Sequence, residues 1–131
     1  IMMRLRSDLV TLCEAALDGK LDQVKAQWDP RPALGVVMAA GGYPNDYRKG
    51  DPIRGLPSGD APDAKVFHAG TARKDGEIVT AGGRVLCACA LGESVYDAKL
   101  RAYELVHGIH WEGAYFRTDI GYRAIARERQ A

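Results

Sequence analysis

Three glycine-centred segments contain the residues best suited to binding chemistry. In chain order they are Gly41-Gly42-Tyr43-Pro44, His68-Ala69-Gly70-Thr71 and Gly82-Gly83-Arg84. Glycine lets a backbone approach a ligand closely and turn its N–H groups toward it, as phosphate-binding loops require. Arg84 adds a planar set of donors that suits a phosphate or a carboxylate. The segments therefore indicate an anion-binding patch. The alternative is that the glycines only form turns and that Arg84 is a solvated charge.

Other candidate residues carry weaker signals. His68 could act as a general base or donate to a phosphate, but a lone histidine in an apolar strand more often has a structural role. No Ser–His–Asp arrangement, paired-carboxylate site or metal-ligand spacing is evident. The sequence therefore predicts no catalytic residue and no metal ligand, and none of the glycine segments matches a P-loop or a dinucleotide fingerprint.

Cys87 and Cys89 are two residues apart in a predicted strand, so their side chains share a face. They could form a redox pair or part of a metal site, or they could be two small buried hydrophobic residues. We favour the last interpretation because no second Cys/His cluster completes a metal shell. The total of three cysteines argues against a secreted disulfide scaffold and favours a reducing cytoplasm.

Length and composition restrict the class of protein. The chain has 131 residues, of which 47% are hydrophobic and 27% charged, and its net charge is +1. These values are typical of one soluble globular domain. The near-neutral charge gives no support to nucleic-acid binding, and no apolar run approaches the roughly 18–20 residues of a membrane span.

Hydrophobic periodicity predicts the elements of the first half. An apolar stripe predicts a helix from Ser7 to Asp18, with Ser7 as its N-cap and Gly19 after its end. Alternation predicts a short strand over residues 24–29, and a nearly continuous apolar run predicts a strand over residues 33–40 that is buried on both faces. Residues 45–64 predict a long ordered loop, anchored to the core by Ile53 and Leu56.

The second half predicts an antiparallel sheet and a helix. Strands are expected over residues 65–73, 77–80 and 84–91, the first two joined by a tight Asp75-Gly76 turn. Ser94 and Asp97 form a shortened capping box before a helix that ends at Gly108. The apolar tail from Ile109 has enough mass to pack back onto the sheet. The fold class is therefore α+β.

Five segments in this order also resemble a known family. They read RLRSDL (residues 4–9), LGVVMAAGGYP (34–44), KVFHAGT (65–71), GGRVL (82–86) and DIGYRAI (119–125). Together they resemble the C-terminal part of the phosphoribosylamine–glycine ligase family, also called glycinamide ribonucleotide synthetase. The resemblance covers essentially the whole chain.

The resemblance implies a fold and an activity. Residues 1–20 would be the trailing helix of an ATP-grasp core, and residues 21–131 the C-terminal substrate-cleft domain, an antiparallel β-rich, hybrid-motif type of domain with flanking helices. The family joins glycine to 5-phosphoribosylamine with ATP and Mg (or Mn), giving glycinamide ribonucleotide, ADP and phosphate in the cytoplasm. Because Ile1 is not an initiator, we expect a fragment that is inactive alone, with no bound cofactor, and that belongs with an N-terminal ATP-grasp portion.

The resemblance also implies a role for the glycine segments, which would contact the phosphoribosyl group. The candidate residues are Gly41, Gly42, Tyr43, His68, Gly70, Thr71, Gly82, Gly83 and Arg84. Two alternatives to the ligase fragment remain open at this point. One is a stand-alone module that binds a phosphorylated sugar metabolite, and the other is a structural domain that docks on a partner.

Overall fold

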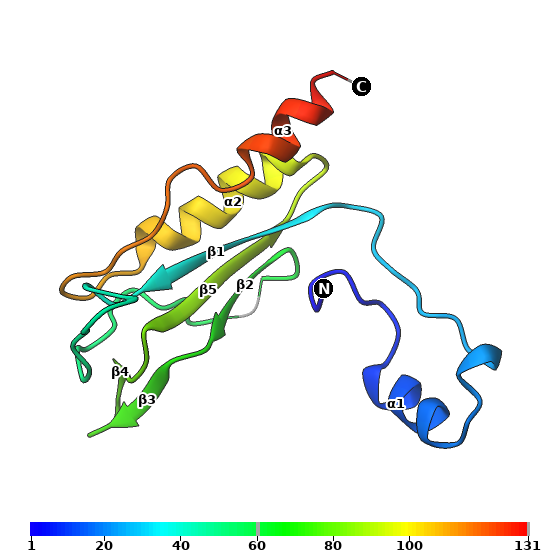
Figure 1. The fold of residues 1–131 in the computed structure, drawn as a ribbon, viewed down its shortest axis with the longest axis horizontal. Helices are drawn as coiled ribbons and strands as arrows, with labels where there is room; N and C mark the ends of the chain where they lie inside the picture. The colour runs from blue at the N-terminus through cyan, green and yellow to red at the C-terminus, as the bar shows by residue number, and fades with distance from the viewer. Residues whose placement is uncertain (60, 131) are drawn as a thin grey trace.

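A three-stranded antiparallel sheet forms the centre of the molecule (Figure 1). The computed structural model describes residues 1–59 and 61–130. Strands β1 (Ala33–Ala39), β5 (Arg84–Leu91) and β2 (Ala64–His68) lie in the order β1-β5-β2, and β3 (Thr71–Lys74) pairs with β4 (Glu77–Thr80) in a separate two-stranded sheet. Helices α1 (Leu9–Leu17), α2 (Val95–Gly108) and α3 (Tyr122–Glu128) and the short 3-10 helix η1 (Leu21–Gln23) complete the elements. The architecture is the predicted α+β class.

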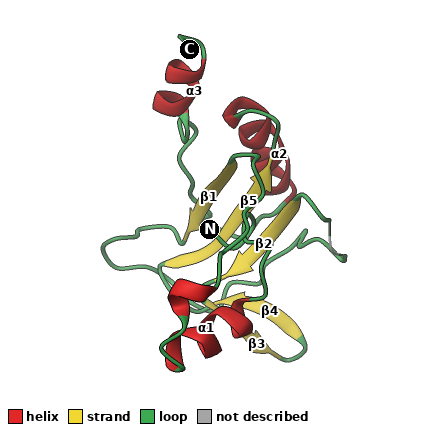
Figure 2. Cartoon of the chain, turned by 90° about the vertical axis from the view of Figure 1, so that its right-hand side faces the viewer, coloured by secondary structure: helices red, strands yellow, loops and turns green. Residues whose placement is uncertain are grey.

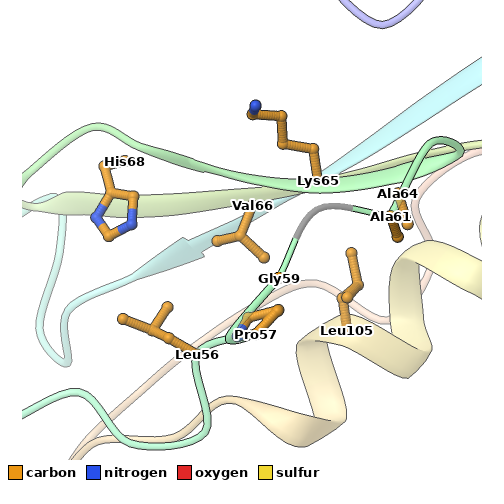
Figure 3. A pocket seen from close by; sticks show the side chains of 9 residues that line it. All are labelled: Leu56, Pro57, Gly59, Ala61, Ala64, Lys65, Val66, His68 and Leu105. Atoms are coloured by element: carbon orange, nitrogen blue, oxygen red, sulfur yellow. The ribbon is translucent and has the colours of Figure 1, made fainter.

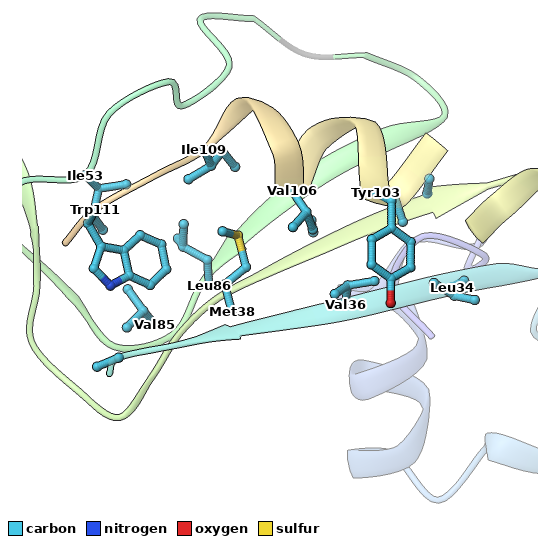
Figure 4. Close-up of a cluster of buried hydrophobic side chains, with 14 of the residues drawn as sticks. Leu34, Val36, Met38, Ile53, Val85, Leu86, Tyr103, Val106, Ile109 and Trp111 are labelled. Carbon is cyan, nitrogen blue, oxygen red and sulfur yellow. The ribbon is translucent and has the colours of Figure 1, made fainter. Parts of the chain in front are cut away.

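Helix α2 covers one face of this sheet and encloses the core between them (Figure 4). The sheet contributes Leu34, Val36 and Met38 of β1 and the buried side chains of β5, while α2 contributes Ala98, Ala102 and Val106. Alanines on both sides let the helix approach the strands closely. Burying each of the larger aliphatic side chains contributes about 1.5–3 kcal/mol, so this layer is the main source of stability.

No helix of residues 1–59 or 61–130 covers the opposite face of the sheet. In β1, Leu34, Val36 and Met38 are buried, whereas Gly35 is exposed and Val37 keeps 43% of its surface exposed. The prediction that this strand is buried on both faces is therefore wrong. The sequence was misleading because the residues on the exposed face, Gly35 and Val37, are not polar. The strand therefore reads as a continuous apolar run, like a strand buried on both faces.

The predicted strand over residues 65–73 is interrupted at Ala69 and Gly70. The N–H groups of both residues donate to the carbonyl oxygen of Val85, at 3.0 Å each. This contact ends the pairing of β2 with β5 and starts the separate β3–β4 hairpin, so the three predicted strands do not form one meander. The hairpin turn itself is confirmed, because Asp75 and Gly76 have φ values of +50° and +84°.

The N-terminal helix begins one residue later than predicted. Asp8 is the N-cap of α1, and its carboxylate accepts a hydrogen bond from the Thr11 N–H at 2.8 Å. Ser7 instead accepts from the N–H of Gln27, at 2.8 Å. The strand predicted over residues 24–29 is wrong: apart from one isolated bridge between Leu5 and Trp28, this segment is irregular.

Helices α1 and α3 lie at different ends of the molecule (Figures 1 and 2). No residue of α1 is buried, and its apolar stripe faces outward. Helix α3 is tied to α2, because the Glu128 carboxylate accepts from the N–H of Val95 at 2.9 and 3.0 Å. The capping box of α2 is confirmed, since Ser94 and Asp97 bond each other reciprocally.

The predicted long loop connects β1 to β2. Ile53 is buried in the core and Leu56 packs against it, as expected; residue 60 of this loop lies outside the described residues. No helix in the described part of the chain is long and apolar enough to cross a membrane.

Candidate functional site

The three glycine turns meet at one end of the central sheet. β1 and β2 end there and β5 begins there, because both outer strands run antiparallel to β5. The Ala40 N–H donates to the Gly83 carbonyl oxygen at 2.8 Å, and the Ala81 N–H donates to the Gly70 carbonyl oxygen at 2.7 Å. Turns that are far apart in the sequence are thus joined by direct backbone contacts.

Close backbone approach explains why glycine is needed in this cluster. A Cβ atom on Gly70 would lie 2.6 Å from the Arg84 carbonyl oxygen and 2.8 Å from the Gly82 Cα atom. A Cβ atom on Gly83 would overlap the ring of Tyr43. Real Cβ atoms do not make such contacts, so side chains at these positions would force the turns apart.

Only some of the turn amides are free to meet a ligand. The N–H groups of Gly70 and Gly82 donate to the carbonyl oxygens of Val85 and Gly70, at 3.0 and 3.1 Å. Within residues 1–59 and 61–130, the N–H groups of Gly41, Gly42 and Gly83 donate to no other group. The unbonded backbone donors therefore belong to the exposed Gly41 and Gly42 of the first turn and to the buried Gly83 of the third, and the second turn acts through packing.

A β-bulge in β5 determines where Arg84 points. The register pairs Met38 with Leu86 but Ala39 with Arg84, so Val85 is an extra residue in β5. Val85 and Leu86 are both fully buried. With regular alternation Arg84 would share the core face with Leu86, but the extra residue turns it to the open face opposite Ala39.

Arg84 lines a pocket of about 260 Å³ on this open face. The other lining residues are mostly apolar and come from β1, from Tyr43 and from the segment 115–120. Arg117 also lines it, but its guanidinium is held by the Asp119 carboxylate through two hydrogen bonds, at 2.8 and 2.6 Å. In the described part of the chain Arg84 makes no ion pair, so its guanidinium is available to an anion.

The tail supplies pocket residues that the sequence did not single out. Tyr115 pairs with Ala39 through two backbone hydrogen bonds of 2.7 and 2.9 Å, which brings Tyr115, Phe116 and Arg117 beside β1. The aromatic residues were predicted to pack back onto the sheet. No local pattern indicated that they would border Arg84, because that depends on long-range pairing.

His68 and Thr71 do not join the pocket that contains Arg84. Figure 3 shows His68 and Val66 on the side of β2 facing Leu56 and Pro57, whereas Lys65 points to the other side. His68 lines a separate pocket of about 130 Å³, and its Nδ1 atom lies 3.0 Å from the Thr71 hydroxyl. Of the nine predicted residues, Tyr43 and Arg84 line the larger pocket and the glycines build the turns beside it.

The two strand cysteines differ from the interpretation as buried hydrophobic residues. Cys87 and Cys89 are half-buried on the open face, and their sulfur atoms lie 3.5 Å apart. Among residues 1–59 and 61–130 there is no group of three or more His, Cys, Asp or Glu side chains that could hold a metal ion.

Comparison with known proteins agrees with the resemblance of the five segments. The family model for the C domain of phosphoribosylglycinamide synthetase matches residues 33–123. The chain is 65% identical over 130 residues to the phosphoribosylamine–glycine ligase of Vibrio vulnificus strain CMCP6, and 64% identical over 129 residues to that of Pseudomonas aeruginosa. It covers 30% of either relative, while the matches cover 99% and 98% of the chain.

A solved structure supports the fold. The crystal structure of the phosphoribosylamine–glycine ligase from Thermotoga maritima matches with a TM-score of 0.66 and 39% sequence identity, over 85% of this chain and 29% of that chain. The chain thus spans about 30% of the length of the relatives it matches. With the family match over residues 33–123, the chain belongs to the phosphoribosylglycinamide synthetase C-domain family.

Proposed function

We propose that this chain is part of an ATP-dependent ligase that joins glycine to 5-phosphoribosylamine, giving glycinamide ribonucleotide, ADP and phosphate in the cytoplasm. Its own contribution is one wall of the site for the phosphoribosyl group. The observation that carries this proposal is Arg84, which makes no ion pair in the described part of the chain and is turned by the bulge to the open face, at the end of the sheet where the glycine turns meet. A sugar phosphate needs inward N–H groups and a guanidinium.

The wall acts by binding and by excluding water rather than by acid–base chemistry. The pocket residues next to Arg84 are mainly Val37, Tyr43, Tyr115 and Phe116, which can pack on a ribose ring and displace water. Acyl phosphates hydrolyse in water, so a ligase that forms one benefits from a closed cleft. ATP and its Mg (or Mn) ion would be held by the part of the ligase that this chain does not span, since the chain covers only 30% of a full-length relative.

The open surface of α1 supports a neighbouring portion of the same polypeptide as partner. Leu9, Val10 and Leu17 expose 47%, 64% and 88% of their surface, which is costly for a helix that stays in water. We propose that an ATP-grasp portion covers this helix. The domain boundary proposed at residues 20/21 is crossed by two backbone hydrogen bonds, from the Arg6 N–H to the Gln27 carbonyl oxygen and from the Asp29 N–H to the Arg4 carbonyl oxygen.

The decisive experiment uses Arg84→Ala in a full-length ligase that carries this chain as its C domain. Hydrogen bonds to a charged group contribute about 1.5–3 kcal/mol, so we expect the KM for phosphoribosylamine to rise roughly ten- to hundredfold. The KM for ATP should stay nearly unchanged. The matched control is Arg127→Ala, an exposed arginine of α3 that removes the same charge. An equal rise for both substrates, or an equal effect of the control, would contradict the phosphate role.

A binding measurement on the chain alone distinguishes the stand-alone module. Calorimetry with ribose 5-phosphate should show measurable binding, lost in Arg84→Ala, if the chain is sufficient by itself. The ligase proposal expects weak binding or none, together with no ligase turnover by the isolated chain. Formation of glycinamide ribonucleotide by these residues alone would overturn it.

A further inference from the structure

Two thiols lie side by side on the open face of the sheet. Cys87 and Cys89 follow each other on the same side of β5, and their Sγ atoms are 3.5 Å apart. Both are free thiols and both are half-buried. Neither thiol lines the Arg84 pocket, although Gly35 borders both pockets, and the thiols have no part in the function proposed above.

A glycine makes the room in which these sulfur atoms meet. Gly35 of β1 pairs with Cys89, and a Cβ atom at Gly35 would lie 2.9 Å from the Cys89 Sγ and 3.1 Å from the Cys87 Sγ. Any side chain at this position would therefore push the sulfur atoms away. The two thiols converge over the one position of β1 that has no side chain.

The distance between the two sulfur atoms suits chelation of one metal ion better than a disulfide bond. Alternate residues of a strand have Cα atoms about 6.6 Å apart, near the upper limit of roughly 6.8 Å for a disulfide. With metal–sulfur distances of about 2.3 Å, a sulfur separation of 3.5 Å corresponds to an S–metal–S angle of about 100°. A metal ion can thus bind both sulfur atoms without moving the strand.

The surroundings favour a soft ion. The thiols line a pocket of about 420 Å³ together with Met2 and Met3, which supply thioether sulfur. The described residues around this pocket include no carboxylate and no imidazole, the ligands that harder ions prefer. Soft thiolate and thioether donors suit Cu(I), Zn and Fe–S clusters, but zinc and iron–sulfur sites use at least three Cys, His or carboxylate ligands, so two thiols and a thioether suit Cu(I).

We propose that Cys87 and Cys89 chelate one Cu(I) ion, with a thioether of Met2 or Met3 as the third ligand. Binding forms two Cu–S(thiolate) bonds, releases one proton from each thiol to solvent and leaves the site with a charge of −1.

The test is an anaerobic titration of the chain with Cu(I) against a chromophoric Cu(I) chelator. We expect one equivalent to bind. The double variant Cys87→Ser/Cys89→Ser should weaken binding by more than the roughly 10–100-fold typical of losing an outer-shell partner. The control Cys13→Ser removes the exposed thiol of α1 and should change nothing. Unchanged affinity in the double variant, or an equal loss in the control, would overturn the site.

Two further variants test the geometry. Gly35→Ala keeps both thiols in the chain, but the new Cβ atom would push their sulfur atoms apart. Cu(I) affinity should therefore fall at least about tenfold, while circular dichroism still shows the folded chain. Met2→Leu/Met3→Leu keeps the apolar volume and removes both thioethers, and it should also weaken Cu(I) binding. Full affinity in Gly35→Ala would contradict the chelate, and full affinity in the methionine variant would overturn the third ligand.

Discussion

At the scale of single residues, glycines at the end of the sheet have two different kinds of importance. Gly70 is required by packing, because the backbone atoms of Gly82 and Arg84 lie where its Cβ would be. Gly108, the last residue of α2, has nothing within 4 Å of the same position. The same residue type is therefore sterically demanded in one place and free to change in the other.

This difference gives a stability prediction. Gly70→Ala should lower the free energy of unfolding by about 1–3 kcal/mol, the usual cost of forcing atoms into a packed region. Gly108→Ala should raise it by about 0.5–1 kcal/mol, because alanine restricts the unfolded chain and favours the helix. Urea denaturation of both variants measures the two changes. Equal effects would show that the close approach of the turns is not part of the folded state.

Asp29 is the most deeply buried charged residue among those described, with 1% of its surface exposed. The Arg31 side chain donates to its carboxylate oxygens at 3.1 and 2.9 Å, the Arg31 N–H donates at 2.9 Å, and Arg6 also forms an ion pair with it. The hydrogen bonds from Arg31 hold the pKa of the Asp29 carboxyl well below its usual value. The group thus links folding to pH.

Because the folded state lowers this pKa, the stabilisation is fully present above the unfolded value of about 3.9 and is lost as the pH falls below it. We expect the denaturation midpoint to drop between pH 5 and pH 3 more steeply in the unaltered chain than in Asp29→Asn. Asp22→Asn, which changes an exposed carboxylate of η1, should follow the unaltered chain. If the denaturation midpoint fell with pH equally in all three proteins, other groups would be responsible for the sensitivity to acid.

At the scale of elements, the start of α2 depends on two interactions from different parts of the chain. Ser94 and Asp97 form the capping box, and Glu128 of α3 accepts from the next free amide, that of Val95. Ser94→Ala should therefore cost about 1 kcal/mol in unfolding free energy, read from the urea midpoint. Glu128→Gln, which keeps an acceptor and loses only the charge, should cost less. A larger loss in Glu128→Gln would mean that α3, rather than the cap, holds this end.

Sequence patterns predicted the elements that are fixed by local signals. The capping box of α2, the Asp75-Gly76 hairpin and the limits of β1 and β5 all follow from residues close together in the chain. Elements that depend on distant partners were missed. The break at Gly70 exists because of a carbonyl of β5, and the segment 24–29 is irregular because it packs on residues 4–7.

The candidate site follows the same rule. The glycines and Arg84 could be chosen from the sequence because residue type alone marks them. That His68 faces away from Arg84, and that Tyr115 and Arg117 lie beside it, depends on strand register and on the return of the tail. Alternation along β5 would even have placed Arg84 in the core, since the position of a bulge is not evident from local residue types.

At the scale of the whole molecule, the central sheet with α2 should be much more stable than the N-terminal helix α1. The core lies between α2 and the central sheet, whereas no residue of α1 is buried. A helix of nine residues is also shorter than the roughly 12–15 that an isolated helix needs in water. Amides of α1 should exchange with solvent close to the unprotected rate, while those of β5 exchange only by global unfolding. Hydrogen exchange followed by mass spectrometry measures both, and equal protection of α1 and α2 would show that α1 is held by contacts of its own.

The extra residue in β5 has a consequence for transplanting this site. If only the tripeptide Gly82-Gly83-Arg84 were copied onto a regular antiparallel strand, the alternation of side chains would place the guanidinium on the same face as Leu86, which here is the hydrophobic core. The extra residue Val85 shifts this alternation by one position and so moves Arg84 to the open face. The smallest portable unit is therefore four residues together with the partner strand that accommodates the mismatch, and removing one aliphatic residue would be enough to send the charge to the wrong side.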